Sequence, residues 1–418
     1  MASSKLTAPR GTNDLLPPES WRWHEVTRLA LDSFALAGYA PIETPAFEHT
    51  EVFERGVGTA TEVVSKQMYT FTDSGGRSLT LRPEGTAPVV RAVLEHSLNR
   101  GPLPIKLSYA EAMFRQERPQ KGRYRQFFQV GIEAIGSDNP LVDAEVIEVG
   151  RRYLADAGVP TTLLVNSIGH LDRSCRQGYL DVLREWLGAH ADALAPPDRE
   201  RIATNPLRTF DSKEQATVAA LRGAPLINDH LCDACRKHFD AVLELLGVLD
   251  VEFVVEPRLV RGLDYYTRTA FEYVAEGLGA QDAVGGGGRY DGLAEALGGD
   301  SLPGIGFALG VDRILLASDR SDWTVPTIDV YVVAIGPDAA RVALPLATRL
   351  RTAGIGADLD LAGRSMKGQM KDADRSGARW AVILGAEEIA SGRATLKDLS
   401  SGDQRSVSFD DIEQSVRP

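Results

Sequence analysis

The chain has 418 residues, which is enough for two or three domains with full hydrophobic cores. Its formal net charge of −12 argues against indiscriminate nucleic-acid binding but allows a local basic surface for one specific RNA. No apolar run approaches the roughly 20 residues of a membrane helix. Residues 1–20 lack a signal-peptide core, so we expect a cytoplasmic protein without a membrane span. Three cysteines do not suggest a disulfide scaffold.

The N-terminal third predicts a helix, an interface strand and a second helix with a polar start. Residues 21–38 have the pattern of a helix that ends in a glycine cap. Two prolines in the following segment, GYAPIETPAFE, fit an edge or interface strand. Residues 78–86 predict a short strand and a turn. Glu84 and Thr86 begin the next helix, where helix capping alone would explain both side chains.

Residues 106–135 predict a hairpin with arms over 106–117 and 126–135, joined by a polar turn over 118–125. Residues two apart on a strand share a face. Phe128 thus falls on an apolar face of the second arm. The opposite face carries Phe127, Gln129, Gly131 and Glu133. On the first arm, Arg115 and Glu117 share a face.

If the two polar faces coincide, one sheet surface carries a guanidinium, two carboxylates, an amide, an aromatic ring and a glycine-sized gap. Such a face is costly to bury without partners, and it suits a ligand with an anionic part, a flat ring and a cationic part. The turn adds cations suited to phosphates: Arg118, Lys121, Arg123 and Arg125. A solvated hairpin is the alternative interpretation.

A helical insertion is predicted over residues 169–247, after a helix at 141–157 and a strand at 160–168. It contains a Cys-x2-Cys pair flanked by histidines, a pattern that can hold zinc. The residues are His230, Cys232, Cys235 and His238. The second pair of ligands is missing and the spacing fits one exposed helix, so we expect no metal ion there.

Residues 259–274, LVRGLDYYTRTAFEYV, predict a strand-like segment dense in functional side chains: Arg261, Asp264, Tyr265, Tyr266 and Arg268. Amphipathic sheet packing would explain them, but their density beside a glycine favours a lined pocket. Four glycines at 285–288 weaken a strand, so we interpret them as letting the backbone approach a ligand; a flexible turn is the alternative. Arg313 lies near the start of the helix that follows PGIGFALG, where one arginine would usually be a surface residue.

After a linker at 321–327, the last ninety or so residues predict an α/β domain with a largely parallel sheet. The alternating strands and helices are expected at 330–335, 338–353, 355–360, 365–376 and 380–384, followed by two strands and a helix. No glycine-rich phosphate loop follows the first strand. A basic stretch is either a solvated face or an RNA contact: Arg364, Lys367, Lys371, Arg375 and Arg379.

Together these stretches resemble the bacterial histidyl-tRNA synthetases, which are class II aminoacyl-tRNA synthetases, over nearly the whole chain. GYAPIETPAFE is similar to class II motif 1, with Pro45 as its proline. MFRQERPQKGRYRQFFQVGIE is similar to motif 2, although Phe128 stands where the family commonly has histidine. PGIGFALGVDR is similar to motif 3, with Arg313 as its arginine. The histidine-specific signatures are LVRGLDYYTRTAFE and GGGGRYDGL.

The resemblance implies a role for each matching residue. The histidine-binding set is Glu84 and Thr86 at the α-amino group, Gln129, Glu133, and Tyr265 and Tyr266 around the imidazole. The ATP-binding set is Arg115 and Arg261 on opposite sides of the α-phosphate, Glu117 at the adenine edge, Phe127 under adenine and Arg313 at the ATP tail. Gln120 and Arg123 are expected to contact tRNA.

The implied chemistry fits these residues. The histidine carboxylate attacks the α-phosphorus of ATP and expels pyrophosphate, so that positioning and charge neutralisation by Arg115 and Arg261 do most of the work. Histidine then passes to a ribose hydroxyl at the 3′ end of its tRNA, and no general base for this step is evident. Mg2+ is expected with ATP, without an obvious ligand set, and zinc is not expected. A pocket of Glu, Gln and Tyr groups rejects amino acids that lack imidazole.

The expected architecture is an α+β catalytic domain over 1–322, built on a mixed, mainly antiparallel sheet of six to seven strands. It carries the helical insertion over 169–247 and is followed by an α/β anticodon-binding domain over 327–418. The family implies a homodimer with motif 1 at the interface.

Two rival functions are open. Synthetase-like regulatory subunits of histidine biosynthesis bind histidine without aminoacylating, but they generally lack the anticodon domain and the motif arginines, which are present here. Threonyl and prolyl synthetases share the architecture but would not carry RGLDYYTRT.

Overall fold

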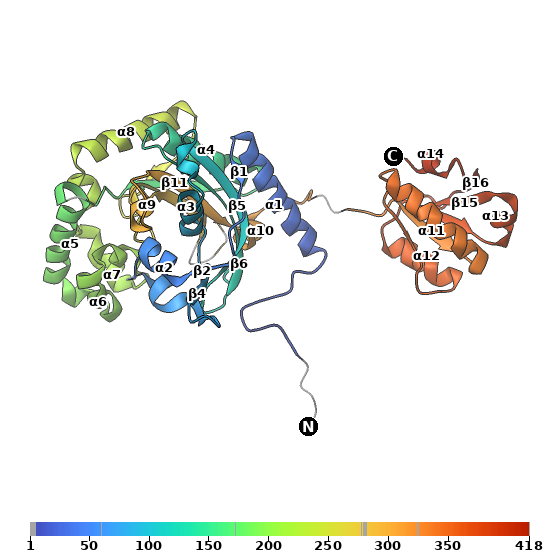
Figure 1. The fold of residues 1–418 in the computed structure, drawn as a ribbon, viewed down its shortest axis with the longest axis horizontal. Coiled ribbons are helices and arrows are strands. Elements are labelled where there is room, and N and C mark those ends of the chain that lie inside the picture. Colours follow the sequence, from blue (N-terminus) through green and yellow to red (C-terminus); the bar gives the residue numbers. More distant parts are fainter. Residues whose placement is uncertain are drawn as a thin grey trace, which may run out of the picture. The chain divides into compact units, whose positions relative to one another are not determined.

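The structure is a computed structural model that describes residues 6–59, 61–171, 173–276, 278, 282–323 and 326–417. The chain forms two compact units, Met1–Trp323 and Thr324–Pro418 (Figure 1). Among the described residues, none of the helices combines the length and the apolarity that crossing a membrane requires.

A mainly antiparallel sheet forms the centre of the first unit. In the described part of the chain it has eight strands, in the order β1 (Ala40–Pro41), β5 (Ile105–Phe114), β6 (Gln126–Ile135), β11 (Gly304–Gly310), β10 (Ala283–Arg289), β9 (Thr267–Val274), β7 (Thr162–Ser167) and β8 (Val254–Val255). The two edge pairs are parallel and the others antiparallel. The expected mixed sheet is confirmed, and two-residue edge strands, one of which contains Pro41, raise the strand number to eight.

The alternation in β6 separates two faces of this sheet. Val130 and Ile132 belong to a core covered by α1 (Glu19–Leu36), α4 (Pro140–Asp156), α8 (Asp233–Val248) and α10 (Val311–Ala317). Phe128 lies on this side, with its ring centroid 4.7 Å from that of Trp23. Phe127 packs on the opposite side, against the core that includes α3 (Thr86–Glu95) and α9 (Leu293–Ala296). The departure at Phe128 therefore lies away from the predicted ligand face.

Two predicted strands are shorter in the structure. Strand β5 ends at Phe114, so Arg115 and Glu117 lie beyond it, although the Arg115 N–H still donates to the Arg125 carbonyl at 2.9 Å. Strand β9 begins at Thr267, and residues 259–266 form a loop. The Asp264 N–H in this loop donates to the Val57 carbonyl at 3.2 Å, so a contact with a distant segment replaces strand pairing.

The glycine run is a central strand, so the alternative of a flexible turn is wrong. Strand β10 pairs with β9 on one side and β11 on the other. A Cβ at Gly287 would overlap the Gly306 carbonyl oxygen. The missing side chains thus allow neighbouring strands to approach closely. Arg289, at the end of the run, is fully buried and its Nε lies 2.9 Å from an Asp143 carboxylate oxygen.

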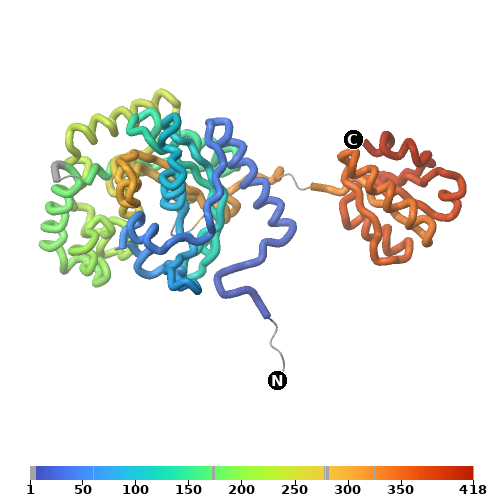
Figure 2. Tube along the Cα trace, viewed as in Figure 1, coloured from blue at the N-terminus to red at the C-terminus, as the bar shows by residue number. Residues whose placement is uncertain are grey.

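The chain between β7 and β8 is helical, as predicted. Its α-helices are α5 (Gly178–Ala189), α6 (Pro196–Thr204), α7 (Gln215–Ala220) and α8. The first three are grouped at one side of the first unit, drawn in green in Figure 1 and in Figure 2. A small second sheet has the strand order β2 (Phe47–His49), β4 (Ser78–Leu81) and β3 (Tyr69–Thr72), with α2 (Thr50–Phe53) following β2.

The second unit is the predicted α/β fold. Its sheet has the order β13 (Ala357–Leu359), β12 (Val330–Ala334), β14 (Trp380–Leu384), β15 (Arg393–Asp398) and β16 (Gln404–Ser408). The first three strands are parallel and the last two pair antiparallel. The helices are α11 (Pro337–Thr352), α12 (Met366–Arg375), α13 (Ala386–Ser391) and α14 (Ile412–Val416). The prediction missed the short α13.

Candidate active site

Two buried carboxylates form the centre of the site. Glu84 precedes α3, and its oxygens accept hydrogen bonds from the backbone N–H groups of Thr86 at 2.8 Å and Ala87 at 2.9 Å. Glu133 projects from β6 and accepts a hydrogen bond from the Thr86 hydroxyl at 2.7 Å. Glu84 therefore caps the helix, as one interpretation held, and Thr86 joins it to Glu133. The structure brings all three predicted residues together.

Tyrosines surround this pair. The Tyr265 hydroxyl donates to Glu84 at 3.2 Å, and its ring centroid lies 4.6 Å from that of Tyr266. Tyr290 donates to Glu133 at 2.7 Å, and the Tyr109 hydroxyl lies 3.4 Å from the other Glu133 oxygen. The hydroxyl groups orient both carboxylates inside an aromatic wall.

Sequence reasoning missed Tyr109 and Tyr290. Tyr109 is paired with Gly131 across β5 and β6, and a Cβ at Gly131 would lie 2.5 Å from the Tyr109 hydroxyl oxygen. The glycine-sized gap is therefore filled by Tyr109. The alternation that places Arg115 would also have placed Tyr109 on this face. Tyr290 lies inside the recognised GGGGRYDGL segment, but its distance from Glu133 along the sequence hides the contact.

Burial governs the electrostatics of the pocket. It raises the pKa of Glu133 to about 8, and the neighbouring Glu84 carboxylate acts in the same direction. Burial also raises the pKa of Glu84, against the hydrogen bonds from Thr86 and Ala87 and the charge of Arg115. Two carboxyl groups held close together in this way favour a cation between them, because a cation stabilises their charged forms. The pocket is suited to an ammonium group.

A cationic and aromatic end lies beside the carboxylates. The Arg115 Nε–H donates to the Pro83 carbonyl, directly before Glu84, at 2.8 Å. Its guanidinium carbon is 5.3 Å from the centroid of the Phe127 ring. Glu117 lies 3.7 Å from Arg115 and 3.3 Å from Arg123. A guanidinium, a flat ring and a carboxylate therefore meet at the loop end of the hairpin.

Arg261 approaches from the loop before β9. Its Nη1 lies 2.7 Å from a Glu272 oxygen, and its guanidinium carbon lies 5.7 Å from the Tyr266 ring centroid. Burial opposes its charge, but Glu272, Tyr266 and Tyr265 together offset this and raise the pKa of Arg261. A Cβ at Gly286 would come within 3.1 Å of its Nη1, so one glycine of the run makes room for this arginine. Its buried Nε has no hydrogen-bond partner among the described residues.

Arg313 and Gln129 are two further residues that were predicted for the site. The Arg313 Nε–H donates to the Ala283 carbonyl at 2.6 Å, which ties the start of α10 to β10. Burial and the charge of Arg123 lower the pKa of Arg313. Gln129 on β6 has a buried Oε1 without a partner in the described structure, as expected of an atom that awaits a ligand donor.

The loop between β5 and β6 holds the residues predicted to contact tRNA. Gln120 and Arg123 exchange backbone hydrogen bonds of 3.1 and 2.9 Å across a tight turn. Gln120 is exposed. The structure places it in the loop and does not bring it to the carboxylate pocket.

Comparison with known proteins agrees with this geometry. A family profile described as Histidyl-tRNA synthetase matches residues 11–314. The chain belongs to the histidyl-tRNA synthetase family. The resemblance carried by the motifs is thereby confirmed. A second profile, described as Anticodon binding domain, matches residues 329–417.

Relatives in this family match over the full length. A histidine–tRNA ligase of Halothermothrix orenii is 49% identical over 403 residues, covering 96% of this chain and 96% of that protein. A histidine–tRNA ligase of Mycobacterium tuberculosis is 50% identical over 415 residues, covering 98% of this chain and 97% of that protein. The crystal structure of apo S. aureus histidyl-tRNA synthetase aligns with a TM-score of 0.82 at 36% identity, covering 99% of this chain and 100% of that one.

Proposed function

We propose that the chain is a histidine–tRNA ligase. It activates L-histidine with ATP to histidyl-adenylate and pyrophosphate, and then transfers histidine to the 3′ end of its tRNA. The observation that carries this proposal is the buried pair of Glu84 and Glu133, lined by tyrosines and bordered by Arg115. This arrangement offers carboxylates to an ammonium group, hydroxyls to a polar ring, and a guanidinium to a phosphate.

Histidine binds in the acidic pocket. Glu84 and Thr86 hold its α-ammonium group, and Glu133 and Gln129 contact its polar groups. Tyr265 and Tyr266 form the walls and hydrogen-bond partners of the imidazole. An amino acid without imidazole would leave these buried polar atoms unpaired. Unpaired buried polar groups make a site discriminate strongly against the wrong substrate.

ATP binds at the cationic end. Phe127 stacks under adenine, Glu117 meets the adenine edge and Arg313 contacts the terminal phosphates. Arg115 and Arg261 flank the α-phosphate as the catalytic pair. A histidine carboxylate oxygen forms the new bond to phosphorus while the bond to the β-phosphate oxygen breaks. Both reactants are anionic, so two fixed guanidinium groups lower the barrier by positioning and by charge stabilisation.

Magnesium is expected to enter with ATP. Mg2+ typically uses one or two carboxylates together with substrate phosphates. Among the described residues, the candidate metal ligands that lie close together are one histidine and three cysteines. Sulfur ligands suit a softer ion than Mg2+. We therefore assign Mg2+ to the phosphates and give it no further protein ligands.

We propose that the second unit, residues 327–418, binds the tRNA anticodon. The catalytic domain then spans residues 1–322, with its insertion at 169–247. Lys367 and Lys371 are exposed one helical turn apart on α12. Arg375 lies 3.6 Å from Asp372, so part of the basic stretch is internally paired. Gln120 and Arg123 contact the acceptor end of the tRNA.

We further propose a cytoplasmic homodimer with motif 1 at its interface. Leu36, at the end of α1, is 87% exposed. Phe47 and Phe71 are also exposed, and their rings contact each other with centroids 6.1 Å apart. Large apolar side chains exposed at a surface, two of them in contact, favour a protein contact. Sedimentation velocity tests this proposal, and a monomer at micromolar concentration would contradict it.

ATP–pyrophosphate exchange with each of the twenty amino acids, without tRNA, tests the activity. Exchange with histidine alone is expected. Exchange with another amino acid would point to a different class II synthetase. Binding of histidine in calorimetry without any exchange would point to a regulatory relative that has kept the pocket but lost the reaction.

A further inference from the structure

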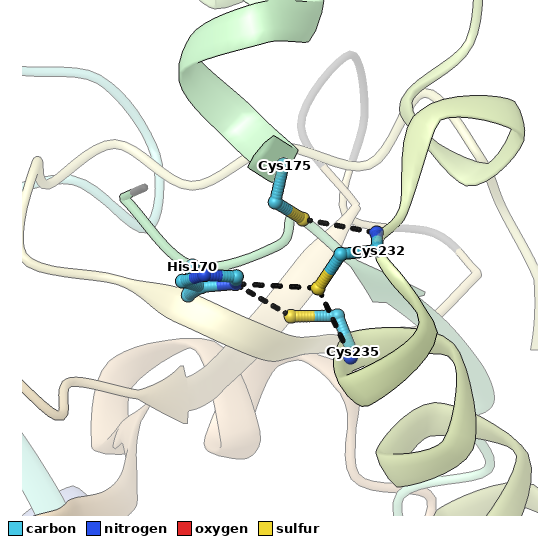
Figure 3. A group of neighbouring side chains, drawn as sticks. All are labelled: His170, Cys175, Cys232 and Cys235. Carbon is cyan, nitrogen blue, oxygen red and sulfur yellow. Dashed lines mark hydrogen bonds between the residues drawn. The ribbon is translucent and has the colours of Figure 1, made fainter. Parts of the chain in front are cut away.

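All three cysteines of the chain meet at one point, together with a histidine. The four residues are His170, Cys175, Cys232 and Cys235, and Figure 3 shows their side chains converging. The His170 Nδ1 lies 3.0 Å from the Cys235 sulfur and 3.7 Å from the Cys232 sulfur. All four potential ligand atoms lie within 4.8 Å of one another. Cys175 and Cys235 are buried.

Separate segments contribute to this cluster. His170 follows β7, and Cys175 lies in the turn before α5. Cys232 is the N-cap of α8, and Cys235 lies in the first turn of that helix. The Cys235 N–H donates to the Cys232 sulfur at 3.5 Å, and the Cys232 N–H donates to the Cys175 sulfur at 3.5 Å. These hydrogen bonds fix the positions of the Cys175 and Cys232 sulfurs relative to the start of α8.

We propose that these four residues bind a structural zinc ion. Three thiolates and one imidazole are an established tetrahedral zinc set, and Zn–S and Zn–N bonds of about 2.3 and 2.0 Å place such ligands about 3.5 to 3.8 Å apart. The separations of 3.0 and 3.7 Å between His170 and two of the sulfurs, and of no more than 4.8 Å between any two ligand atoms, are compatible with that range. A closed set of four protein ligands leaves no position for a substrate.

The expectation of no metal rested on a missing second pair of ligands. The structure supplies that pair from far upstream, because Cys175 and His170 precede Cys232 by 57 and 62 residues. The histidines that flank the Cys-x2-Cys pair lie elsewhere. His238 is 3.1 Å from Asp143, and the ring of His230 packs near Tyr179 with centroids 5.4 Å apart.

A disulfide between two of the cysteines is the competing use of this cluster. It would consume two sulfurs and leave the third sulfur and the imidazole without a function, whereas zinc uses all four groups. The position of His170 beside two sulfurs is what favours zinc.

The zinc site would join the two ends of the helical insertion. Its ligands come from the two ends of the insertion, and the chain beside it leads to the histidine pocket. Arg176, next to Cys175, donates to the Tyr266 carbonyl at 2.7 Å, and the Arg268 N–H donates to the Gly169 carbonyl at 2.8 Å. Zinc would thus hold the insertion against the loop that carries Tyr265 and Tyr266.

Elemental analysis of the full chain, purified under reducing conditions with added zinc, tests the proposal. About one zinc ion per chain is expected for the unchanged protein. Cys175→Ser and Cys232→Ser should each lower the content at least tenfold, and His170→Ala should lower it as well. His230→Ala is the matched control, because this nearby histidine lies outside the cluster, and it should retain the ion.

A second measurement covers variants that fail to fold. Cobalt substitution of the unchanged protein should give thiolate-to-cobalt charge-transfer bands and the intense d–d bands of a tetrahedral site. A mercurial reagent should release zinc as the three thiols react. Absence of zinc and cobalt binding in folded, reduced protein, or a disulfide found by mass spectrometry in protein purified without reductant but with zinc, would overturn the proposal. These readouts do not depend on aminoacylation activity.

Discussion

Arg261 gives the sharpest test at the scale of a single residue. Its guanidinium is held by Glu272 and lies over Tyr266, with a buried Nε that has no partner in the described structure. We expect Arg261→Ala to reduce kcat for ATP–pyrophosphate exchange by at least about 100-fold, the effect of losing one fixed stabilising group. The melting temperature should change little.

Arg258→Ala is the matched control, because Arg258 directly precedes this loop but is exposed and donates to the Arg222 carbonyl at 3.3 Å. It should exchange normally. A near-normal exchange rate in Arg261→Ala would remove this residue from the catalytic pair.

Glu133 predicts a pH dependence of stability. Its pKa is raised from 4.5 to about 8, chiefly by burial. The folded apo protein therefore keeps a proton that the unfolded chain releases above about pH 4.5, so Glu133 contributes stability at low pH that is lost as the pH rises to about 8. Glu133→Gln stays neutral throughout. The melting temperature of Glu133→Gln, relative to that of the unchanged protein, should therefore rise between about pH 5 and pH 8. A difference in melting temperature that stays constant over this range would contradict the raised pKa of Glu133.

At the scale of one strand, two adjacent phenylalanines test the assignment of the sheet faces. Phe128 packs on Trp23 and the helices, whereas Phe127 lies beside Arg115. Phe128→Ala should cost about 1–3 kcal/mol of stability, because its ring is only partly buried, and leave the KM for ATP unchanged. Phe127→Ala should raise the KM for ATP with a smaller loss of stability. Denaturant unfolding and pyrophosphate-exchange kinetics of both variants test the assignment. Equal changes in stability and in KM for ATP in the two variants would refute it.

At the scale of elements, some features could be predicted from the sequence and others could not. The alternation over 126–135 predicted both faces of β6, because a period of two is local information. The loop at 259–266 was mistaken for a strand, since a hydrogen bond from Asp264 to distant Val57 determines its path. Tyr290 on Glu133 and His170 beside Cys235 depend on strand register and on chain return over many residues, which no local pattern encodes.

At the scale of the whole molecule, family motifs predicted what local patterns could not. The candidate site residues come from α3, the β5–β6 hairpin, the loop before β9 and α10, and the motifs assigned them to one site. The structure brings Glu84, Thr86 and Glu133 together, as that assignment requires. The strand count depended on two-residue edge strands, which carry too few residues to show a period. Where the resemblance had no motif, at the helical insertion, the Cys232–Cys235 pair was noticed but its neighbours His170 and Cys175 were missed.

The division of labour between the two units gives the last prediction. Trp323 packs in the core of the first unit, with the Arg320 guanidinium carbon 4.8 Å from its ring centroid, so a chain ending at Trp323 keeps that core. We expect this truncation to keep pyrophosphate exchange within about threefold while kcat/KM for aminoacylation falls at least about 100-fold, or about 2.7 kcal/mol, because the anticodon contacts are lost. In the full chain, Lys367→Ala with Lys371→Ala should weaken tRNA binding without changing exchange, and Lys397→Ala serves as a control from another element of the same unit. Equal loss of both steps in the truncated chain would show that the second unit supports catalysis itself and does not act only through tRNA.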